Sequence, residues 1–303
     1  MRRQKRRGIA ERGISTVGDA LAWAEEQLRR IDGARCRQEA EVFLAGLLAL
    51  PRIELYLNRQ APLCLSRQRR LRRWVALRRR HVPLQYLMGE AVFYGLTLKT
   101  ARGVFLPRPE TEVLVERLIG LLKRLHPGGP LRILELCAGS GNIAIALTKE
   151  LSYCKIYISD ISRKAVALAR KNARAHGVAE CIRFFCGDLY QALPAGVEPF
   201  DLIVANPPYV TRAEMKGLPP EVRDYEPAAA LCGGADGLSV ARRIVRGSRK
   251  FLRVDGYLAM ELGESQRERM TAIIRQTAQF DRPEFFADLN GKERFFVCRR
   301  AYG

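Results

Sequence analysis

From residue 131 onward, short apolar runs alternate with helical patterns, and this alternation restricts the fold more than any other feature of the sequence. A strand that is followed by a helix and then by another strand needs a crossover connection, so such strands run parallel. A run of helix and strand breakers at residues 126–130, His-Pro-Gly-Gly-Pro, separates this region from the chain before it. The pattern predicts an α/β fold on a mostly parallel, doubly wound sheet.

The predicted elements of this region follow in chain order. Apolar runs predict strands at Leu131–Leu136, Cys154–Ser159, Cys181–Cys186, Phe200–Ala205 and Gly256–Glu261. Helical spacing predicts helices at Asn142–Leu151, Arg163–His176, Ser239–Phe251 and Ser265–Gln279. The runs Pro283–Ala287 and Glu293–Cys298 predict a hairpin that completes the sheet across Asn290-Gly291, a dipeptide that favours tight turns.

Residues 17 to about 80 show helical periodicity, which predicts a small helical bundle. Two short strands are predicted around Gly95, and a further helix begins near Thr111 behind two prolines. Arg108 is a candidate ion-pair partner of Glu110 and Glu112 in that first turn. We therefore divide the chain into a basic tail at 1–16, a helical domain expected to dock a substrate at 17–88, a β-hairpin linker at 89–106 and a sheet domain at 107–303.

The net charge indicates which classes of partner the protein could bind. The 303 residues include 52 Lys or Arg and 32 Asp or Glu, which gives a net charge of +20. This charge fits an acidic partner such as RNA. However, the Arg residues are spread over the whole chain, as a GC-rich coding sequence produces, so no direct nucleic-acid partner is required. Apolar runs fall short of the roughly 20 residues of a membrane helix, so no membrane partner is expected.

The eight cysteines form no C-x-x-C pair and have no accompanying paired His spacing. This usage predicts reduced thiols, a cytoplasmic location and no bound metal. The basic start is followed by no apolar stretch, so it does not read as a secretory signal. We expect a monomer.

The turn after the first strand of the sheet predicts a nucleotide-like cofactor. Gly139 and Gly141 allow close approach of a ligand to the backbone, and Asp160 ends the next strand, where ribose hydroxyls lie in such sites. A dinucleotide is the first alternative, but Ala144 stands where its third glycine belongs. Glu135 would repel a pyrophosphate and attract a sulfonium or amino group, and Asp188 suits an adenine amino group. The combination favours S-adenosylmethionine.

The stretch Asn206-Pro207-Pro208-Tyr209 follows a buried strand and predicts a site for a planar, uncharged amino group. A carboxamide accepts and donates hydrogen bonds, two prolines stiffen the loop, and a phenol ring offers a flat face. A proline-rich turn with Asn as a local cap would also explain these four residues, if they stood alone.

Taken together, these motifs resemble the HemK family of class I S-adenosylmethionine-dependent methyltransferases. Members of this family methylate the side-chain amide of the glutamine in the Gly-Gly-Gln motif of peptide-chain release factors. The resemblance covers about residues 17 to 299. The residues that carry it are Glu135-Leu-Cys-Ala-Gly-Ser-Gly141, Asp160, Asp188, Asn206-Pro-Pro-Tyr209, Pro107-Arg-Pro-Glu-Thr-Glu112, Glu226–Leu231 and Gly233–Leu238.

The resemblance implies a seven-stranded, Rossmann-like catalytic domain and an N-terminal helical domain. It implies that the substrate glutamine is held by Asn206, Pro207, Pro208 and Tyr209, and we assign catalysis to Asn206, Pro207 and Tyr209 among these. The cofactor contacts that it implies are Glu135, Leu136, Cys137, Ala138, Gly139, Gly141, Asp160, Asp188, Leu189 and Asn206. Cys137 stands where the family usually has glycine, and Leu189 where some members carry an aromatic residue.

The predicted chemistry is positioning of a weak nucleophile. The Asn206 side-chain oxygen and the Pro207 carbonyl are expected to accept the two amide protons, with Tyr209 against the amide plane. Two other readings remain. A DNA or RNA amino methyltransferase would use the same four residues to hold a flipped base. A cofactor-binding fold that only docks a partner would bind without turnover.

Overall fold

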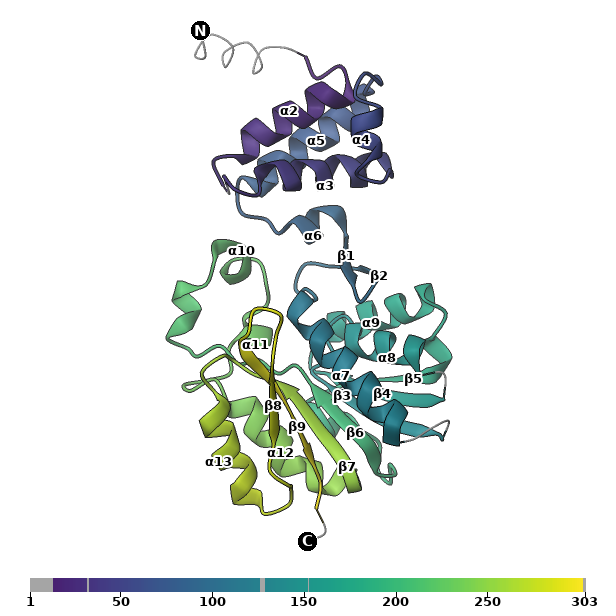
Figure 1. Cartoon of the computed structure of the whole chain (residues 1–303), viewed down its shortest axis with the longest axis vertical. Helices are drawn as coiled ribbons and strands as arrows, with labels where there is room; N and C mark the ends of the chain where they lie inside the picture. Colours follow the sequence, from purple (N-terminus) through teal and green to yellow (C-terminus); the bar gives the residue numbers. More distant parts are fainter. Residues whose placement is uncertain (1–12, 32, 126–128, 152, 302–303) are drawn as a thin grey trace. The chain divides into compact units, whose positions relative to one another are not determined.

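The structure is a computed structural model that describes residues 13–31, 33–125, 129–151 and 153–301. The chain forms two compact units, the first ending at Gly89 and the second beginning at Glu90 (Figure 1). Each unit has its own buried core. In the described residues, no helix is both long and apolar enough to cross a membrane.

The first unit is the helical bundle that the periodicity predicts. Its core is apolar and includes Leu28, Phe43, Leu44 and Leu71, all fully buried. These residues come from different helices, whose apolar stripes face one another because each stripe repeats every three to four residues. The helices are α2 (Val17–Leu28), α3 (Cys36–Leu48), α4 (Glu54–Leu57), α5 (Leu65–Arg78) and α6 (Leu84–Met88).

The predicted tail at 1–16 ends too late. Residues 1–12 lie outside the described residues, but Ile14 is 2% exposed and belongs to the core of the helical unit. Thr16 caps α2, because its hydroxyl accepts from the Asp19 N–H while the Asp19 carboxylate accepts from the Thr16 N–H. The capping box therefore fixes the start of the helix from within the unit.

The second unit contains the predicted sheet. Its seven described strands have the order β5-β4-β3-β6-β7-β9-β8, and β9 runs in the direction opposite to the other six. This confirms the predicted α/β class and the hairpin across Asn290-Gly291. The strands are β3 (Leu131–Leu136), β4 (Cys154–Asp160), β5 (Ile182–Cys186), β6 (Phe200–Ala205), β7 (Leu252–Glu261), β8 (Glu284–Ala287) and β9 (Glu293–Arg299).

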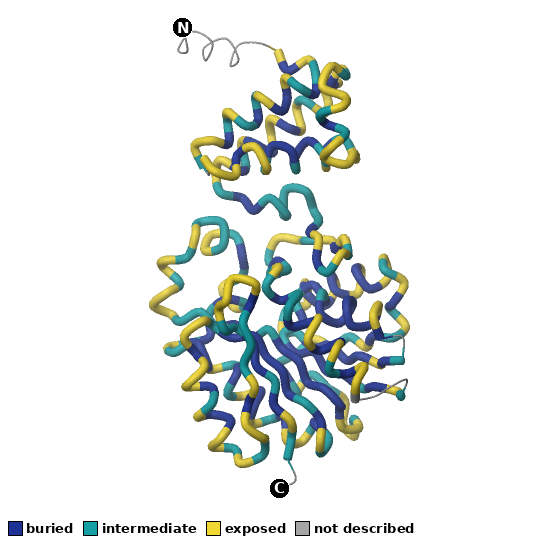
Figure 2. Tube along the Cα trace, in the orientation of Figure 1, coloured by how far each residue is buried: buried dark blue, intermediate teal, exposed yellow. Residues whose placement is uncertain are grey.

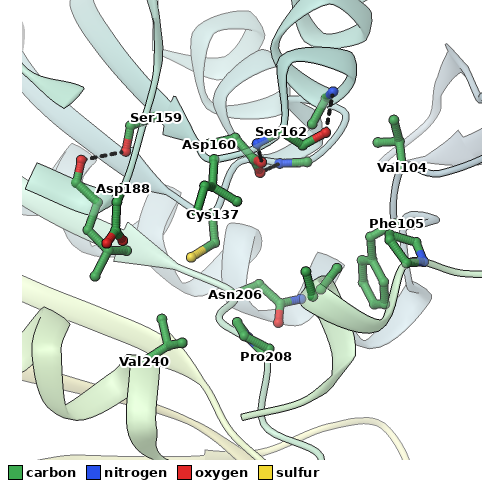
Figure 3. Close-up of a pocket in the computed structure, with 18 of the residues that line it drawn as sticks. Val104, Phe105, Cys137, Ser159, Asp160, Ser162, Asp188, Asn206, Pro208 and Val240 are labelled. Atoms are coloured by element: carbon green, nitrogen blue, oxygen red, sulfur yellow. Dashed lines mark hydrogen bonds between the residues drawn. The ribbon is translucent and has the colours of Figure 1, made fainter. Parts of the chain in front are cut away.

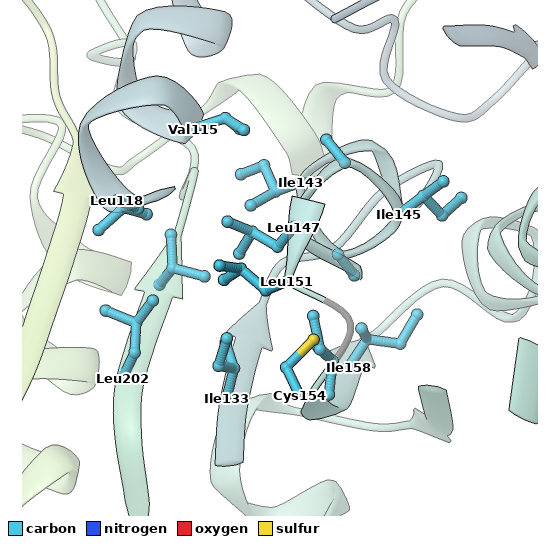
Figure 4. Close-up of a cluster of buried hydrophobic side chains, with 14 of the residues drawn as sticks. Val115, Leu118, Ile133, Ile143, Ile145, Leu147, Leu151, Cys154, Ile158 and Leu202 are labelled. Atoms are coloured by element: carbon cyan, nitrogen blue, oxygen red, sulfur yellow. The ribbon is translucent and has the colours of Figure 1, made fainter. Parts of the chain in front are cut away.

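Helices cover both faces of this sheet. Alternate residues of each strand point to opposite faces, so Ile133 packs with Leu147 and Leu118 on one side (Figure 4), whereas Leu134 packs with Ile244 on the other. The central strands β3, β4 and β6 are buried along most of their length (Figure 2). One layer contains α7 (Pro109–Leu125), α8 (Asn142–Glu150) and α9 (Arg163–Ala175); the other contains α12 (Ser239–Phe251) and α13 (Arg267–Thr277).

The segment predicted as a linker at 89–106 is part of the second unit. Its strands β1 (Glu90–Phe93) and β2 (Leu96–Lys99) form an antiparallel hairpin. Phe93 and Leu98 are fully buried in the core of the sheet unit. Burial of two large apolar side chains makes the hairpin a structural element of that unit rather than a connection between domains.

Several element boundaries differ from prediction by one or two residues, and the start of β7 differs by four. β7 begins at Leu252 rather than Gly256, because Phe200 pairs with Leu252 ahead of an irregularity in the ladder. α7 begins at Pro109, two residues before Thr111, since proline fits the first helical turn. Short helices between the strands were not predicted: η1 (Ala179–Cys181), η2 (Leu189–Ala192), η3 (Glu214–Gly217), α10 (Pro220–Arg223) and α11 (Ala228–Leu231).

Replacing Phe93 by alanine tests the assignment of the hairpin. We expect Phe93→Ala to destabilise the sheet unit by about 3–5 kcal/mol, because it leaves a cavity in the core. The neighbouring Val92 is 71% exposed, so Val92→Ala should change stability by less than about 0.5 kcal/mol. Hydrogen exchange at the β3 amides is the measurement, since both tryptophans lie in the helical unit. Unchanged exchange in Phe93→Ala would show that the hairpin is only a linker.

Candidate active site

A cavity of about 350 Å³ lies at the carboxyl ends of β3, β4, β5 and β6 (Figure 3). β3 lies between β4 and β6, so the chain builds the sheet outward on both sides of β3. In open α/β sheets, ligands bind outside the strand ends at such a reversal of strand order. The volume is typical of a small-molecule site.

Asp160, at the end of β4, organises one part of the cavity. Its two carboxylate oxygens accept from the Gly139 N–H and the Ser162 N–H, each at 2.8 Å. Burial raises the pKa of this carboxyl, while the two hydrogen bonds lower it. The side chain therefore holds the turn after β3 against the loop after β4, and each oxygen keeps capacity for a further donor.

The turn after β3 has left-handed backbone at Cys137, Gly139 and Gly141. Glycine adopts this conformation without strain, whereas Cys137 does so at a cost of about 1–2 kcal/mol. The turn thus keeps a glycine-like backbone at residue 137 and adds a thiol, which points into the cavity (Figure 3). Burial raises the pKa of the Cys137 thiol, so it stays neutral. At Gly141 a Cβ would lie 3.0 Å from the Ala169 Cβ of α9, which leaves little room for a side chain.

Asp188 and Leu189 line the cavity from the end of β5. The Asp188 carboxylate pairs with Arg243 of α12 at 2.6 Å, and both side chains are more than one third exposed. Such an ion pair contributes little stability, but it orients both groups at the cavity. Leu189 is 7% exposed and, with Val240, supplies an aliphatic wall of the cavity.

Asn206, at the end of β6, has its carboxamide fixed by two buried groups. Its Nδ2 donates to Glu261 Oε2 at 2.9 Å and to Thr111 Oγ1 at 3.3 Å. The Thr111 hydroxyl itself donates to Glu261 Oε2 at 2.6 Å, so both partners of Asn206 act as acceptors. Only the amide nitrogen can face two acceptors. The Asn206 oxygen is therefore left as the acceptor of a side chain that lines the cavity.

Glu261, at the end of β7, is 1% exposed and sits behind Asn206. Burial is the main reason that the pKa of its carboxyl rises to about 7; hydrogen bonds from Thr111 and Tyr209 and the charge of Arg294 oppose this rise. The Tyr209 hydroxyl thus contacts Glu261, and burial raises the pKa of that phenol. Glu261 is an orienting group for Asn206, because the cavity is lined by Asn206 and not by Glu261 itself.

The backbone of the Asn206–Tyr209 loop is held by the segment after α11. The Gly233 N–H donates to the Val210 carbonyl at 2.8 Å, and the Gln266 side chain donates to the Tyr209 carbonyl at 2.8 Å. A Cβ on Gly233 would lie 2.4 Å from the Pro208 carbonyl oxygen. Residue 233 therefore has to be glycine for the two segments to pack this closely.

Glu135 lies outside the main cavity. It is 1% exposed, accepts from the Ala144 N–H at 2.8 Å, and has its pKa raised to about 8, chiefly by burial. It lines a much smaller cavity of about 20 Å³, together with Arg108 and Thr111. Cys137, Gly139 and Asn206 line both cavities, so the two are neighbours.

The structure brings most of the sequence-predicted residues together, but not all of them. Neither Pro207 nor Tyr209, both described, lines the main cavity, and the same holds for Leu136, Ala138 and Gly141. The sequence interpretation missed Glu261 and Arg243 as site residues, and it gave Thr111 only a capping role. Glu261 ends a predicted strand, just as Asn206 follows one. This shared position at a strand end could have identified Glu261 as a site residue. The predicted residues that line the cavity are Cys137, Gly139, Asp160, Asp188, Leu189, Asn206 and Pro208.

Arg108 does not pair with Glu110 or Glu112 as the sequence interpretation proposed. Its guanidinium pairs with the buried carboxylate of Glu226 and lies over the Phe105 ring, 4.6 Å from the centroid. Glu226 also accepts from the Leu106 N–H at 3.2 Å. Arg108 pairs with the distant Glu226 because a buried carboxylate requires a counter-charge. The carboxylates of Glu110 and Glu112, at the start of a helix, can remain in solvent.

Glu261→Gln tests the buried carboxylate through the pH dependence of stability. Burial raises the Glu261 pKa from 4.5 to about 7, so ionisation opposes folding. The contribution of neutral Glu261 to stability is therefore complete below the unfolded pKa and is lost as pH rises through about 7. Glutamine keeps an acceptor oxygen without ionising. From pH 4.5 to about 8 we expect the free energy of unfolding to shift in favour of Glu261→Gln by on the order of 2–3 kcal/mol.

Paired denaturant titrations of wild type and Glu261→Gln across this pH range provide the measurement. Glu135 is present in both proteins, so its own titration cancels to first order. A difference that does not change with pH would contradict the raised pKa.

Gly233→Ala tests the packing of the Asn206–Tyr209 loop. The added methyl group would lie 2.3 Å from the Gly237 carbonyl oxygen, so one of the two backbone segments must move. We expect a loss of stability of about 1–3 kcal/mol and a displaced loop. At Gly217 a Cβ meets nothing within 4 Å, so Gly217→Ala is the matched control. Thermal unfolding and a crystal structure of each variant would measure this, and equal stability of the two would refute the packing argument.

Comparison with known proteins places this site in a family. Residues 19–89 match the PrmC N-terminal domain, and residues 96–218 match the Methyltransferase small domain. The release factor glutamine methyltransferase of Geobacter sulfurreducens is 38% identical over 88% of this chain and 91% of its own length. That of Moorella thermoacetica is 36% identical over 94% of this chain and 99% of its own length. A methyltransferase structure from Pyrococcus furiosus, 15% identical, shares the fold with a TM-score of 0.51 over 78% of this chain and 99% of that one.

The family resemblance drawn from the motifs is thereby confirmed. Both relatives are more than 30% identical to this chain, in alignments that cover most of this chain and nearly the full length of each relative. On this evidence, the chain belongs to the release factor glutamine methyltransferase family.

Proposed function

We propose that this protein transfers a methyl group from S-adenosylmethionine to the side-chain amide nitrogen of the glutamine in the Gly-Gly-Gln motif of peptide-chain release factors. The observation that carries the proposal is the orientation of Asn206. Its NH2 group is held by Glu261 and Thr111, so its oxygen is left to accept a hydrogen bond from the N–H of an incoming amide. The names of the relatives support the choice of a glutamine as the substrate.

The cavity residues fit the proposed cofactor. Asp160 has acceptor capacity for ribose hydroxyls at the end of β4, where such hydroxyls lie in related folds. Leu189 and Val240 offer apolar faces to a purine, and Asp188 offers an acceptor to its amino group. Glu135 lines the adjoining smaller cavity, and the ammonium group of the methionine part would lower its raised pKa and pair with the ionised carboxylate. When bound, the cofactor supplies an electrophilic methyl group on a sulfonium.

The residues of this chain position the substrate amide. An amide nitrogen is a weak nucleophile because its lone pair is delocalised into the carbonyl. Hydrogen bonds from its two protons to Asn206 Oδ1 and to the Pro207 carbonyl would fix its plane and increase electron density on nitrogen. Tyr209 contributes a ring beside this loop and a hydroxyl that contacts Glu261, so its role includes holding the orienting carboxylate.

Docking of the release factor is assigned to the helical unit, residues 17–88. The exposed side chains of Ile53 and Leu57, on and next to α4, support this assignment. They are 64% and 73% exposed, and exposed large apolar groups are characteristic of protein-binding surfaces. We propose that the protein acts in the cytoplasm as a monomer.

Asn206→Ala tests both the residue assignment and the substrate. With labelled S-adenosylmethionine and a purified release factor, we expect kcat to fall about 10²–10³-fold. The affinity for the cofactor should change by less than about threefold, because Asn206 acts on the amide. Asn290→Ala, in the exposed hairpin turn, is the matched control and should retain wild-type turnover.

The same assay on a release factor whose Gly-Gly-Gln glutamine is changed to alanine identifies the acceptor. Label on the unaltered factor alone is the expected result. Label on neither factor, with transfer to ribosomal RNA that is lost after ribonuclease treatment, would replace this proposal with nucleic-acid methylation. Near-normal turnover in Asn206→Ala would remove Asn206 from the catalytic role.

A further inference from the structure

One face of the helical unit carries a dense positive charge. Helix α5 has six arginines among its 14 residues, and only Arg78 of these is buried, where it pairs with Glu39. The other five are exposed, and within the described part of the chain none of them forms an ion pair with a carboxylate. We call this set the α5 arginine face: Arg67, Arg69, Arg70, Arg72 and Arg73.

The α5 arginine face is unfavourable for an isolated helix. Arg69 is three residues from Arg72 and four from Arg73, and Arg70 is three from Arg73. Like charges at these spacings lie next to one another and destabilise a helix by about 0.2–0.5 kcal/mol each. A binding partner with closely spaced negative charges would turn this repulsion into attraction.

Two of the guanidinium groups are held in place by indole rings. Arg70 lies 4.7 Å from the Trp74 ring centroid, and Arg72 lies 5.0 Å from the Trp23 ring centroid. Cation–π contact restricts a long side chain before any partner binds. A planar guanidinium on a ring keeps its N–H groups at the edge, and these match the oxygens of a phosphate. The surface is therefore partly organised for phosphate recognition.

The composition of the face distinguishes a nucleic acid from an acidic protein. Protein interfaces centre on apolar and aromatic groups and have few charges in their core. Between Arg67 and Arg73, each exposed position of α5 is an arginine, and the apolar residue of this stretch, Leu71, is buried in the unit's core. The exposed Leu65 lies at the start of the helix, ahead of this stretch. A phosphate backbone supplies a continuous line of charge and needs no apolar centre. From Arg67 to Arg73 the helix rises about 9 Å, a length over which a duplex presents about five phosphate charges.

We propose that the α5 arginine face binds the phosphate backbone of RNA. The choice of RNA over DNA rests on the proposed function, because the proposed substrate, a peptide-chain release factor, belongs to translation. The remainder rests on charge, exposure and the arginine–tryptophan contacts. Binding here is a second property of the chain, separate from the cavity at the sheet.

The test compares two charge-matched triple variants in the full-length protein. Arg69→Gln/Arg72→Gln/Arg73→Gln removes three charges from α5, including one that contacts an indole ring. Arg170→Gln/Lys171→Gln/Arg174→Gln removes three exposed charges from α9, including one over the Phe184 ring. The second variant controls for net charge and for loss of a cation–π contact. Glutamine is a good helix former, and circular dichroism of both variants checks that they fold.

Fluorescence anisotropy with a labelled RNA duplex of about 20 base pairs, repeated over a range of salt concentrations, gives the affinity and its salt dependence. Each phosphate contact contributes about 0.9 to the slope of log K against log salt. We expect the α5 variant to lower that slope by about 2–3 and the affinity by about tenfold or more at low salt. The α9 variant should stay close to wild type.

Several outcomes would overturn the proposal. Equal losses in both variants would mean that binding follows diffuse net charge. An unchanged affinity in the α5 variant, or an equal affinity for a DNA duplex of the same length, would also reject it. A raised KM for the release factor with unchanged RNA binding would assign the face to the protein substrate. Methyl transfer by wild type is assayed in parallel, so failure of the proposed function is seen independently of RNA binding.

Discussion

A single buried carboxylate, Glu261, determines which atom of Asn206 the candidate active site offers to a ligand. It accepts from Thr111 and Asn206, which come from the start of α7 and the end of β6, while Glu261 itself ends β7. The Oε2 atom of Glu261 accepts both of these hydrogen bonds, so the Asn206 group that faces it is a donor. The nitrogen of Asn206 must therefore face inward, and its oxygen becomes the acceptor. The proposed chemistry requires this orientation of the Asn206 carboxamide.

The sheet provides the rigidity that this arrangement needs. Strands β6 and β7 are parallel neighbours, so Asn206 and Glu261 end side by side at one edge. Gly233 then allows a second segment to pack directly on the carbonyl of Pro208. Arg108 and Glu226 join the entry of α7 to the segment before α11. Loops are the mobile parts of most folds, and here ion pairing and close backbone packing hold them.

The two units separate two kinds of chemistry. The sheet unit offers a small cavity in which Asp160 and Asn206 are held by hydrogen bonds. The helical unit offers exposed arginines on α5 and exposed apolar residues on and next to α4. A net charge of +20 has no location in a composition. The five arginines within residues 67–73 are visible in the sequence, but their exposure is not. Only the fold separates the arginines that are buried and paired, such as Arg78, from those that are exposed.

The sequence by itself determined the α/β class and the succession of strands and helices along the chain. It also placed Gly139 in a turn and Asp160 and Asn206 at strand ends. These are set by local periodicity and by the rule that parallel strands end at one edge. The tertiary structure decided which polar groups meet: Glu261 with Asn206, and Arg108 with Glu226 rather than Glu110. Such pairs join residues more than 50 positions apart, and burial selects them after the chain has packed, so no local pattern encodes them.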